Sequence, residues 1–309
     1  MSWAIIVHGD TDGLCAGTLL ARAFGGEVWF SRPVSLLHDL SNFDGKDVVI
    51  ADIAVPYHER YTLAKELERI ASRNRLIYID HHPIPEGIEI PGEVIHDLNR
   101  SSSELAYSLV KDMIPREFVK IALYGAIADY SDETPWVVEE LEHWDKRIIY
   151  FQSGMLSQGM GEAQHRYEFK RNLIKEFLRG REPSEIDELV RLALEESLHD
   201  KDLYNDIKRM VKVEKRVAYA IIERGSLSKG AHFALGMTNS TIGICGKIEG
   251  NKIDMSIRAE KHANLDLNRI IREITEKLGG SGGGHRSAAG ASVPKDKFKK
   301  FVEMLNEKI

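Results

Sequence analysis

Carboxylate and imidazole side chains gather at the ends of three short apolar segments early in the chain. They are His8, Asp10 and Asp12, then Asp52, then Asp80, His81 and His82. A carboxylate that is buried without a partner at the end of a strand is costly, or it takes up a proton. The positions of Asp52 and Asp80 therefore predict a bound cation.

Asp129, in the segment Ala126–Asp129, adds a fifth carboxylate to this set. Five carboxylates with two or three imidazoles are too many ligands for one ion, and oxygen-rich sets suit Mn²⁺ or Mg²⁺ better than structural zinc. Two ions about 3.5 to 4 Å apart that share a carboxylate activate water for in-line attack on a phosphoryl group. Any one of these residues alone is more often a helix cap or a hydrogen-bonded histidine. Together they predict a two-metal phosphoester hydrolase.

The elements that must position these ligands are those of an α/β domain. The apolar segments 4–7, 48–53 and 76–79 are β-branched and alternate with helical patterns, which is typical of βαβ units and a parallel sheet. Ligands bind beyond the carboxyl ends of such strands. We therefore expect the three groups of side chains to meet in one crevice.

Residues 134–216 follow a helical pattern. One stripe of apolar residues recurs at helical spacing and comprises Ile186, Leu189, Val190, Ala193, Leu194 and Leu198. Such a stripe packs within the chain or against a second copy. The middle helices are therefore the expected contact if the protein forms a homo-oligomer.

The last part of the chain reads as a second α/β domain with a mixed sheet. Strands are expected at Val217–Glu223, His232–Met237, Ile242–Ile248 and Ile253–Ala259. The last two are joined by the hairpin turn 249–251. One amphipathic helix is expected at 267–278 and another from residue 298.

A glycine-rich segment, Gly279–Gly284, follows the first of these helices and is interrupted only by Ser281. Glycine lets the backbone approach a ligand closely and present N–H groups to an anion. A flexible linker is the alternative, but His285, Arg286 and a small-residue strand follow at once. We therefore expect a binding loop.

The formal net charge of −6 argues against a histone-like binder of nucleic acid. This charge is uneven, because residues 1–216 carry −11 and residues 217–309 carry +5. The basic last part can lie along a phosphate backbone. Two cysteines, Cys15 and Cys245, lack zinc-site spacing and predict a reducing, cytoplasmic location. No segment has the length and apolarity of a membrane span, so no membrane partner is expected.

The order of the first motifs, His8-x-Asp10-x-Asp12-Gly13, Asp52, Asp80-His81-His82 and Asp129, resembles the four motifs of the DHH phosphoesterase family. The glycine-rich run with His285 and Ala288-Ala289-Gly290 is similar to the DHHA1 domain of that family, except that Ser281 replaces the first of four glycines. The resemblance covers residues 1–133 and 217–309. It leaves the helical middle unexplained.

By this resemblance, one metal is held by His8, Asp10 and Asp52, and the other by Asp12, Asp52, His81 and Asp129. Asp80 and His82 then orient ligands or stabilise charge on the scissile phosphate. The implied substrate contacts are Arg258, Gly282, Gly283, Gly284, His285, Arg286, Ser102 and Ser103. A surface arginine is the alternative for Arg258, and helix capping is the alternative for the two serines.

The resemblance implies a Rossmann-like DHH catalytic domain at 1–133, a helical connector at 134–216 and a DHHA1 substrate domain at 217–309. The expected activity is that of a Mn²⁺-dependent 3′ to 5′ exonuclease on single-stranded DNA or short RNA oligonucleotides, with Mg²⁺ as the other candidate metal. The alternatives are a nanoRNase-like phosphatase for adenosine bisphosphate and a non-enzymatic binding module of a replication or repair complex. A repair or replication helicase is a candidate partner for the middle helices.

Overall fold

The computed structural model describes residues 3–163 and 165–309. The chain divides into two compact units, Met1–Glu196 and Ser197–Ile309, and helix α9 (Asp187–Met210) crosses the boundary between them. Each unit has its own hydrophobic core. Residues 134–196 belong to the first unit, because Leu156, Leu173 and Phe177 join the core of its sheet.

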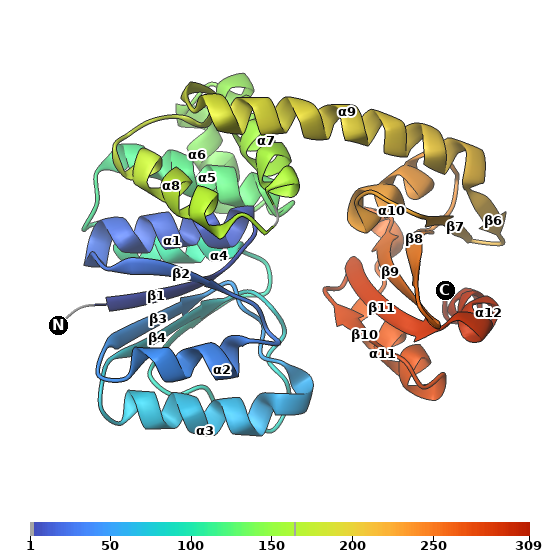
Figure 1. Ribbon diagram of the computed structural model, residues 1–309, viewed down its shortest axis with the longest axis horizontal. Coiled ribbons are helices and arrows are strands. Elements are labelled where there is room, and N and C mark those ends of the chain that lie inside the picture. The colour runs from blue at the N-terminus through green and yellow to red at the C-terminus, as the bar shows by residue number, and fades with distance from the viewer. Residues whose placement is uncertain (1–2, 164) are drawn as a thin grey trace. The chain divides into compact units, whose positions relative to one another are not determined.

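The first unit contains a parallel sheet with the strand order β2-β1-β3-β4-β5 (Figure 1). Its strands are β1 (Trp3–His8), β2 (Glu27–Ser31), β3 (Asp47–Ala51), β4 (Leu76–Asp80) and β5 (Glu93–His96). β3 and β4 are buried throughout, as strands covered on both faces must be. This confirms the predicted parallel α/β fold.

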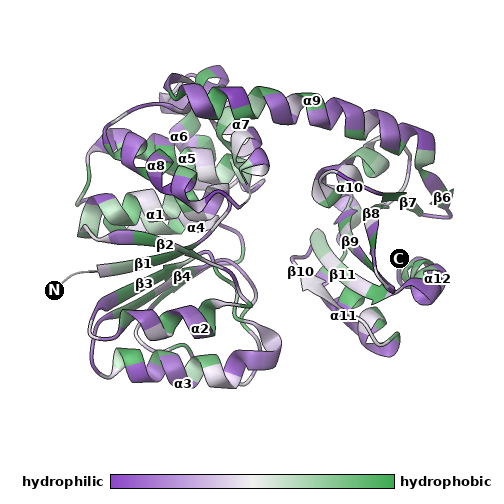
Figure 2. Cartoon of the chain, in the orientation of Figure 1, coloured by the Kyte–Doolittle hydropathy of each residue, from purple (hydrophilic) through white to green (hydrophobic). Residues whose placement is uncertain are grey.

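Helices cover both faces of this sheet (Figure 1). They are α1 (Thr11–Phe24), α2 (Leu36–Leu40), α3 (Arg60–Ala71), α4 (Ser102–Val110), α5 (Val119–Ala128), α6 (Pro135–His143), α7 (Lys146–Glu162) and α8 (Tyr167–Leu178). The core beneath α2 and α3 includes Leu36, Leu63 and Leu67, whereas Leu19 and Leu123 belong to the core of the other face. Figure 2 shows green, hydrophobic strands and many purple, hydrophilic residues on the helices.

Strand register places the candidate ligands at one edge. Val7 of β1 pairs with Ala51 of β3, and Ala51 pairs with Ile79 of β4. His8, Asp52 and Asp80 each follow one of these three residues directly, so they leave the sheet side by side. The sequence alone predicts this edge, because parallel strands all end on the same side.

The second unit contains a mixed sheet with the order β10-β11-β9-β8-β7-β6. Its elements are β6 (Lys212–Glu214), β7 (Val217–Ile222), α10 (Leu227–Gly236), β8 (Ile242–Glu249), β9 (Lys252–Ala259), α11 (Leu267–Lys277), β10 (Ser281–Gly284), β11 (Ala288–Pro294) and α12 (Phe298–Lys308). Within this second sheet, β7 and β8 are parallel, and the other strand pairs described are antiparallel. The predicted mixed sheet and the turn at Gly250 are confirmed.

One local prediction is wrong. Residues 232–236 of the strand expected at His232–Met237 lie in helix α10. This helix begins after Ser226, whose Oγ accepts a hydrogen bond from the Lys229 N–H. Helix α10 packs closely on β8 because Gly243 of β8 has no side chain, and a Cβ there would lie 2.2 Å from the Ala231 carbonyl oxygen. In the predicted apolar stripe, Ile186, Leu189 and Ala193 are buried within the chain, whereas Leu194 and Leu198 are exposed, so packing of these two against a second copy stays a prediction.

No helix of residues 3–163 and 165–309 combines the length and apolarity that crossing a bilayer requires.

Candidate metal centre and substrate site

Asp52 lies at the centre of the acidic cluster, between two sets of side chains. Its Oδ2 atom is 3.8 Å from Nδ1 of His8, which is itself 2.8 Å from Oδ2 of Asp10. Its Oδ1 atom is 3.4 Å from Nε2 of His81. One atom from each of His8, Asp10 and Asp52 lies within 4.8 Å of the others, and the same holds for Asp12, Asp52 and His81. Asp52 is therefore common to two groups that could each hold a metal ion.

The buried Asp12 carboxylate is held by the start of helix α4. The backbone N–H groups of Ser102 and Ser103 donate to its two oxygens at 2.7 and 3.0 Å. Ser102 Oγ also donates to Asp52 Oδ1 at 3.0 Å, whereas Ser103 Oγ donates to the carbonyl of Ala122. Both serines are fully buried. Their donors are directed at the carboxylates in this structure, and contact with substrate stays a prediction.

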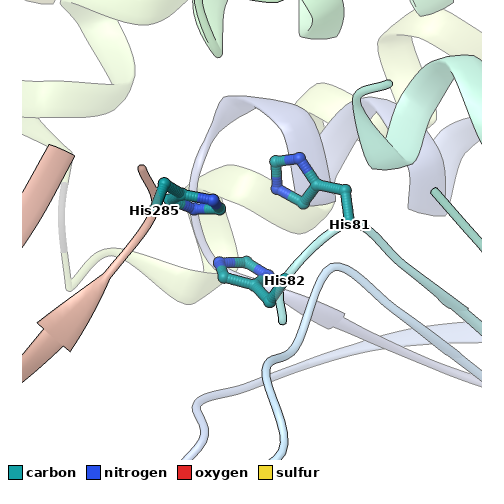
Figure 3. Close-up of side chains that lie close together, drawn as sticks. All are labelled: His81, His82 and His285. Atoms are coloured by element: carbon teal, nitrogen blue, oxygen red, sulfur yellow. The ribbon is translucent and has the colours of Figure 1, made fainter. Parts of the chain in front are cut away.

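His81 and His82 leave the end of β4 in different directions. Their rings are 4.7 Å apart and nearly perpendicular (Figure 3). His81 Nδ1 is 3.5 Å from Oδ2 of Asp129, at the end of α5, so Asp129 joins the His81 side of the cluster. His82 Nδ1 donates to Oδ1 of the buried Asp80 at 2.8 Å. Asp80 thereby orients the imidazole of His82.

Two buried carboxylate oxygens of the cluster lack hydrogen-bond donors among the described residues, which suits the binding of a cation. Oδ2 of Asp52 and Oδ2 of Asp80 are buried and accept no hydrogen bond from the described residues. Asp52 also has a φ of 63°, which is the left-handed region that few residues other than glycine adopt. Buried anionic oxygens are costly unless a positive charge compensates them. Mixed oxygen and imidazole donors are the set that Mn²⁺ and Mg²⁺ accept.

Burial and mutual repulsion control ionisation in the metal-free cluster. Burial raises the pKa of Asp52 well above its ordinary value, and the charges of Asp10 and Asp12 raise it further. Burial also raises the pKa of Asp12 and lowers that of His81. Burial acts against the charged form of His82, but the bond to Asp80 outweighs it and raises the His82 pKa. Burial likewise acts against the charged form of His8, but Asp10 outweighs it and raises the His8 pKa, so His8 and His82 both favour the protonated form in the metal-free cluster.

These shifts predict how stability depends on pH. Without metal, folded Asp52 keeps a proton that the unfolded chain releases near its ordinary pKa of about 4, so stability falls as pH rises above that value toward the raised pKa. A bound cation favours the deprotonated carboxylate and cancels this loss. We expect the melting temperature with Mn²⁺ minus that with chelator to increase from about pH 6 to about pH 8. Calorimetry that finds a constant or shrinking difference contradicts the assignment.

In the second unit, Arg258 on β9 is held by helix α10. Its Nε donates to Nε2 of His232 at 3.2 Å, and its two terminal nitrogens donate to Ser228 Oγ at 2.6 Å and Ser256 Oγ at 3.0 Å. Burial and the guanidinium charge lower the pKa of His232, which keeps its acceptor nitrogen unprotonated. Neither Ser228 nor His232 is predicted from the sequence, because the pattern favours a strand at 232–237 and indicates no element at Ser228.

The glycine-rich segment forms an edge strand rather than the expected loop. Ser281–Gly284 is β10 and pairs with β11, and Gly283 and Gly284 have φ values of 158° and 150°. Side-chain volume is excluded there, because a Cβ at Gly282 would lie 2.7 Å from Ile271 Cγ2. His285, labelled in Figure 3, follows the strand, and its N–H donates to the Ala288 carbonyl. Arg286 donates to Asn264.

Two other residues near the cluster, Gly125 and Lys170, lie outside the motifs recognised in the sequence. Gly125 on α5 packs against the serines of α4, and a Cβ there would lie 2.4 Å from Ser103 Oγ and 2.8 Å from Asp12 Oδ1. Lys170 on α8 is buried, and its Nζ donates to the carbonyl of Gly9. Both were missed because the contacts join segments far apart in the chain.

Comparison with known proteins agrees with this architecture. Residues 213–309 match the model of the DHHA1 domain. A segment of 58 residues is 38% identical to an uncharacterized protein of Methanocaldococcus jannaschii, over 18% of each chain. A segment of 65 residues is 28% identical to the alanine–tRNA ligase of Korarchaeum cryptofilum, over 20% of this chain and 7% of the ligase. The matches thus span less than a fifth of each relative.

Three solved structures share the fold over nearly the whole chain. The pGpG-specific phosphodiesterase of Vibrio cholerae superposes with a TM-score of 0.62 at 16% identity, over 100% of both chains. The DHH domain of a protein described as a member of a ribosomal protein family superposes with a TM-score of 0.73 at 18% identity, over 99% of this chain and 86% of that one. RecJ of Thermus thermophilus in complex with Mn²⁺ superposes with a TM-score of 0.66 at 16% identity, over 98% of this chain and 51% of RecJ.

The fold is therefore that of a DHH domain followed by a second α/β unit. Residues 213–309 match the DHHA1 domain, and the chain shares its fold with proteins that contain DHH and DHHA1 domains. This confirms the resemblance read from the motifs.

Proposed function

We propose that this protein is a phosphodiesterase that depends on two divalent metal ions. The observation that carries the proposal is the position of Asp52, which is shared by the His8–Asp10–Asp52 and Asp12–Asp52–His81 sets. Asp129 supplements the second set through its approach to His81. When bound, two such cations supply Lewis acidity toward a phosphoryl oxygen and lower the pKa of water.

The remaining residues hold these ligands and handle charge. The N–H groups of Ser102 and Ser103 orient the Asp12 carboxylate for a metal ion, and Ser102 Oγ orients that of Asp52. His82 is fixed by Asp80 at Nδ1, and its protonated ring can stabilise charge on the scissile phosphate or protonate the leaving oxygen. Asp80 and His82 are thus the proposed catalytic pair.

The proposed substrate is single-stranded DNA or a short RNA oligonucleotide, cleaved from the 3′ end with Mn²⁺. Residues 217–309 carry a net charge of +5, which suits a phosphate backbone. Arg258 presents a preoriented guanidinium, and β10 presents backbone without side chains. The Thermus RecJ structures contain Mn²⁺ in one case and Mg²⁺ in another, which supports a divalent metal of this kind.

Product ladders test this proposal directly. Purified protein is incubated with 5′-labelled and 3′-labelled DNA and RNA oligonucleotides in Mn²⁺, Mg²⁺ or chelator. A metal-dependent ladder that shortens the 5′-labelled strand one nucleotide at a time supports the proposed polarity. Release of only the terminal nucleotide from the 5′ label reverses the polarity, and no cleavage with either metal contradicts the function.

A phosphodiesterase for very short nucleotides is the second candidate. One solved structure that matches over the full length of both chains is a pGpG-specific phosphodiesterase, and pGpG is a dinucleotide. Comparing kcat/KM for a dinucleotide, adenosine bisphosphate and an oligonucleotide of about ten residues separates the two functions, because a closed terminal pocket favours the small substrate.

Arg258→Met is expected to weaken substrate binding more than turnover. The guanidinium forms charge-assisted bonds that a thioether cannot, so KM should rise about 10-fold to 100-fold while kcat changes little. Arg269→Met removes an exposed arginine of the same unit and should leave KM near the wild-type value. A loss confined to kcat is inconsistent with a binding role for Arg258. Steady-state kinetics on the preferred oligonucleotide measure both constants.

A further inference from the structure

Lys170 is a buried cation beside the candidate metal centre, on a helix that lies outside the sequence motifs. It is 1% exposed. Its Nζ donates to the carbonyl oxygen of Gly9 at 2.5 Å, and Gly9 lies between His8 and Asp10 in the chain. A Cβ built on Gly9 would be 3.4 Å from Nζ. The ammonium group therefore lies against the backbone that joins two proposed metal ligands.

The surroundings of this ammonium are aromatic and acidic. Nζ is 5.9 Å from the ring centroid of Phe30 and 5.5 Å from that of Tyr167, and the two rings stack on each other. Aromatic faces attract a cation, but a buried ammonium still requires nearby negative charge. Burial lowers the pKa of Lys170, and the Asp10 carboxylate opposes that effect. Burial acts to lower the pKa of His8, but Asp10 outweighs burial and the pKa is raised, and the charge of Lys170 opposes that rise.

We propose that Lys170 is a built-in counter-cation of the metal centre. It neutralises part of the acidic cluster in the metal-free protein and weakens cation binding by the His8–Asp10–Asp52 set. A divalent ion there meets an ammonium that is enclosed by protein, where repulsion between like charges is screened little by water. The two ligand sets therefore differ in affinity, with the His8 set the weaker. The inference rests on the proposed function in taking these sets as metal sites.

Lys170→Met tests this, because methionine is unbranched and apolar and fills a similar space. Mn²⁺ binding to metal-free full-length protein is measured by titration calorimetry, and thermal unfolding is recorded with Mn²⁺ and with chelator. We expect the weaker of the two Mn²⁺ affinities to rise about tenfold. The metal-free variant should melt below wild type and gain more from Mn²⁺, since its carboxylates lack their counter-cation.

Lys175→Met is the matched control, because Lys175 is an exposed lysine of the same helix whose charge is screened. It should bind Mn²⁺ as wild type does. Lys170→Gln removes the charge but keeps an N–H donor for the carbonyl of Gly9. This variant replaces Lys170→Met in the Mn²⁺ titration if the methionine variant does not fold. It should also bind Mn²⁺ more tightly.

Unchanged or weaker Mn²⁺ binding in these Lys170 variants overturns the inference. The role of Lys170 toward the metal centre would then be limited to its hydrogen bond to the Gly9 carbonyl. Wild-type protein that binds no Mn²⁺ overturns it as well. Failure of the proposed function is a separate result, because a protein that binds Mn²⁺ with the expected Lys170 effect but hydrolyses no oligonucleotide refutes only the activity.

Discussion

Asp52→Asn is expected to reduce Mn²⁺-dependent hydrolysis about 10³-fold or more, since the variant loses the carboxylate that both ligand sets share. Asparagine keeps the shape of the side chain and tolerates the left-handed backbone at φ 63°. The fold should therefore survive. In chelator above neutral pH the variant should melt at or above the wild-type temperature, because a buried carboxylate with an unbonded oxygen has been removed.

Asp112→Asn is the control for this experiment, since Asp112 is exposed in the same unit. It should retain wild-type hydrolysis and Mn²⁺ binding. Initial rates, circular dichroism and Mn²⁺ titration together separate a lost site from a lost fold. If Asp52→Asn hydrolyses oligonucleotides at the wild-type rate, the assigned metal centre is wrong.

Gly125→Ala is expected to damage stability and activity together. The added Cβ overlaps Ser103 Oγ at 2.4 Å and Asp12 Oδ1 at 2.8 Å, so α4 and α5 must separate or the Asp12 carboxylate must turn. Overpacking of this kind costs about 1 to 3 kcal/mol of unfolding free energy. Displacing a metal ligand should reduce hydrolysis by about 10²-fold, because small misplacements at a catalytic centre have effects of that order.

Gly154→Ala is the matched control for Gly125→Ala. Gly154 is also in a helix, α7, and a Cβ there meets no heavy atom within 4 Å. Alanine should stabilise this position by up to about 1 kcal/mol, because glycine is the poorer helix former. Urea unfolding and initial rates test both variants. Equal behaviour of the two would mean that Gly125 provides no room for the Asp12 carboxylate.

The sequence determined the sheet edge and the acidic cluster, because both follow from short-range patterns. Asp52 and Asp80 end buried strands, and parallel strands end on the same side. The helical spacing of Leu267, Ile271 and Ile274 likewise predicts α11, whose buried face confirms it. Local patterns were not enough at 232–237, where a short apolar segment fits a strand as well as a helix.

Tertiary structure alone decided how the cluster is supported. Ser102 was predicted as a substrate contact, yet its hydroxyl and N–H are directed at Asp52 and Asp12, 50 and 90 residues away in the chain. Lys170 reaches Gly9 across 161 residues, from helices that the motifs left unexplained. Such contacts depend on how whole helices pack against the sheet. Spacing along a sequence does not determine that packing, so motifs predict which residues are ligands and the fold shows what holds them.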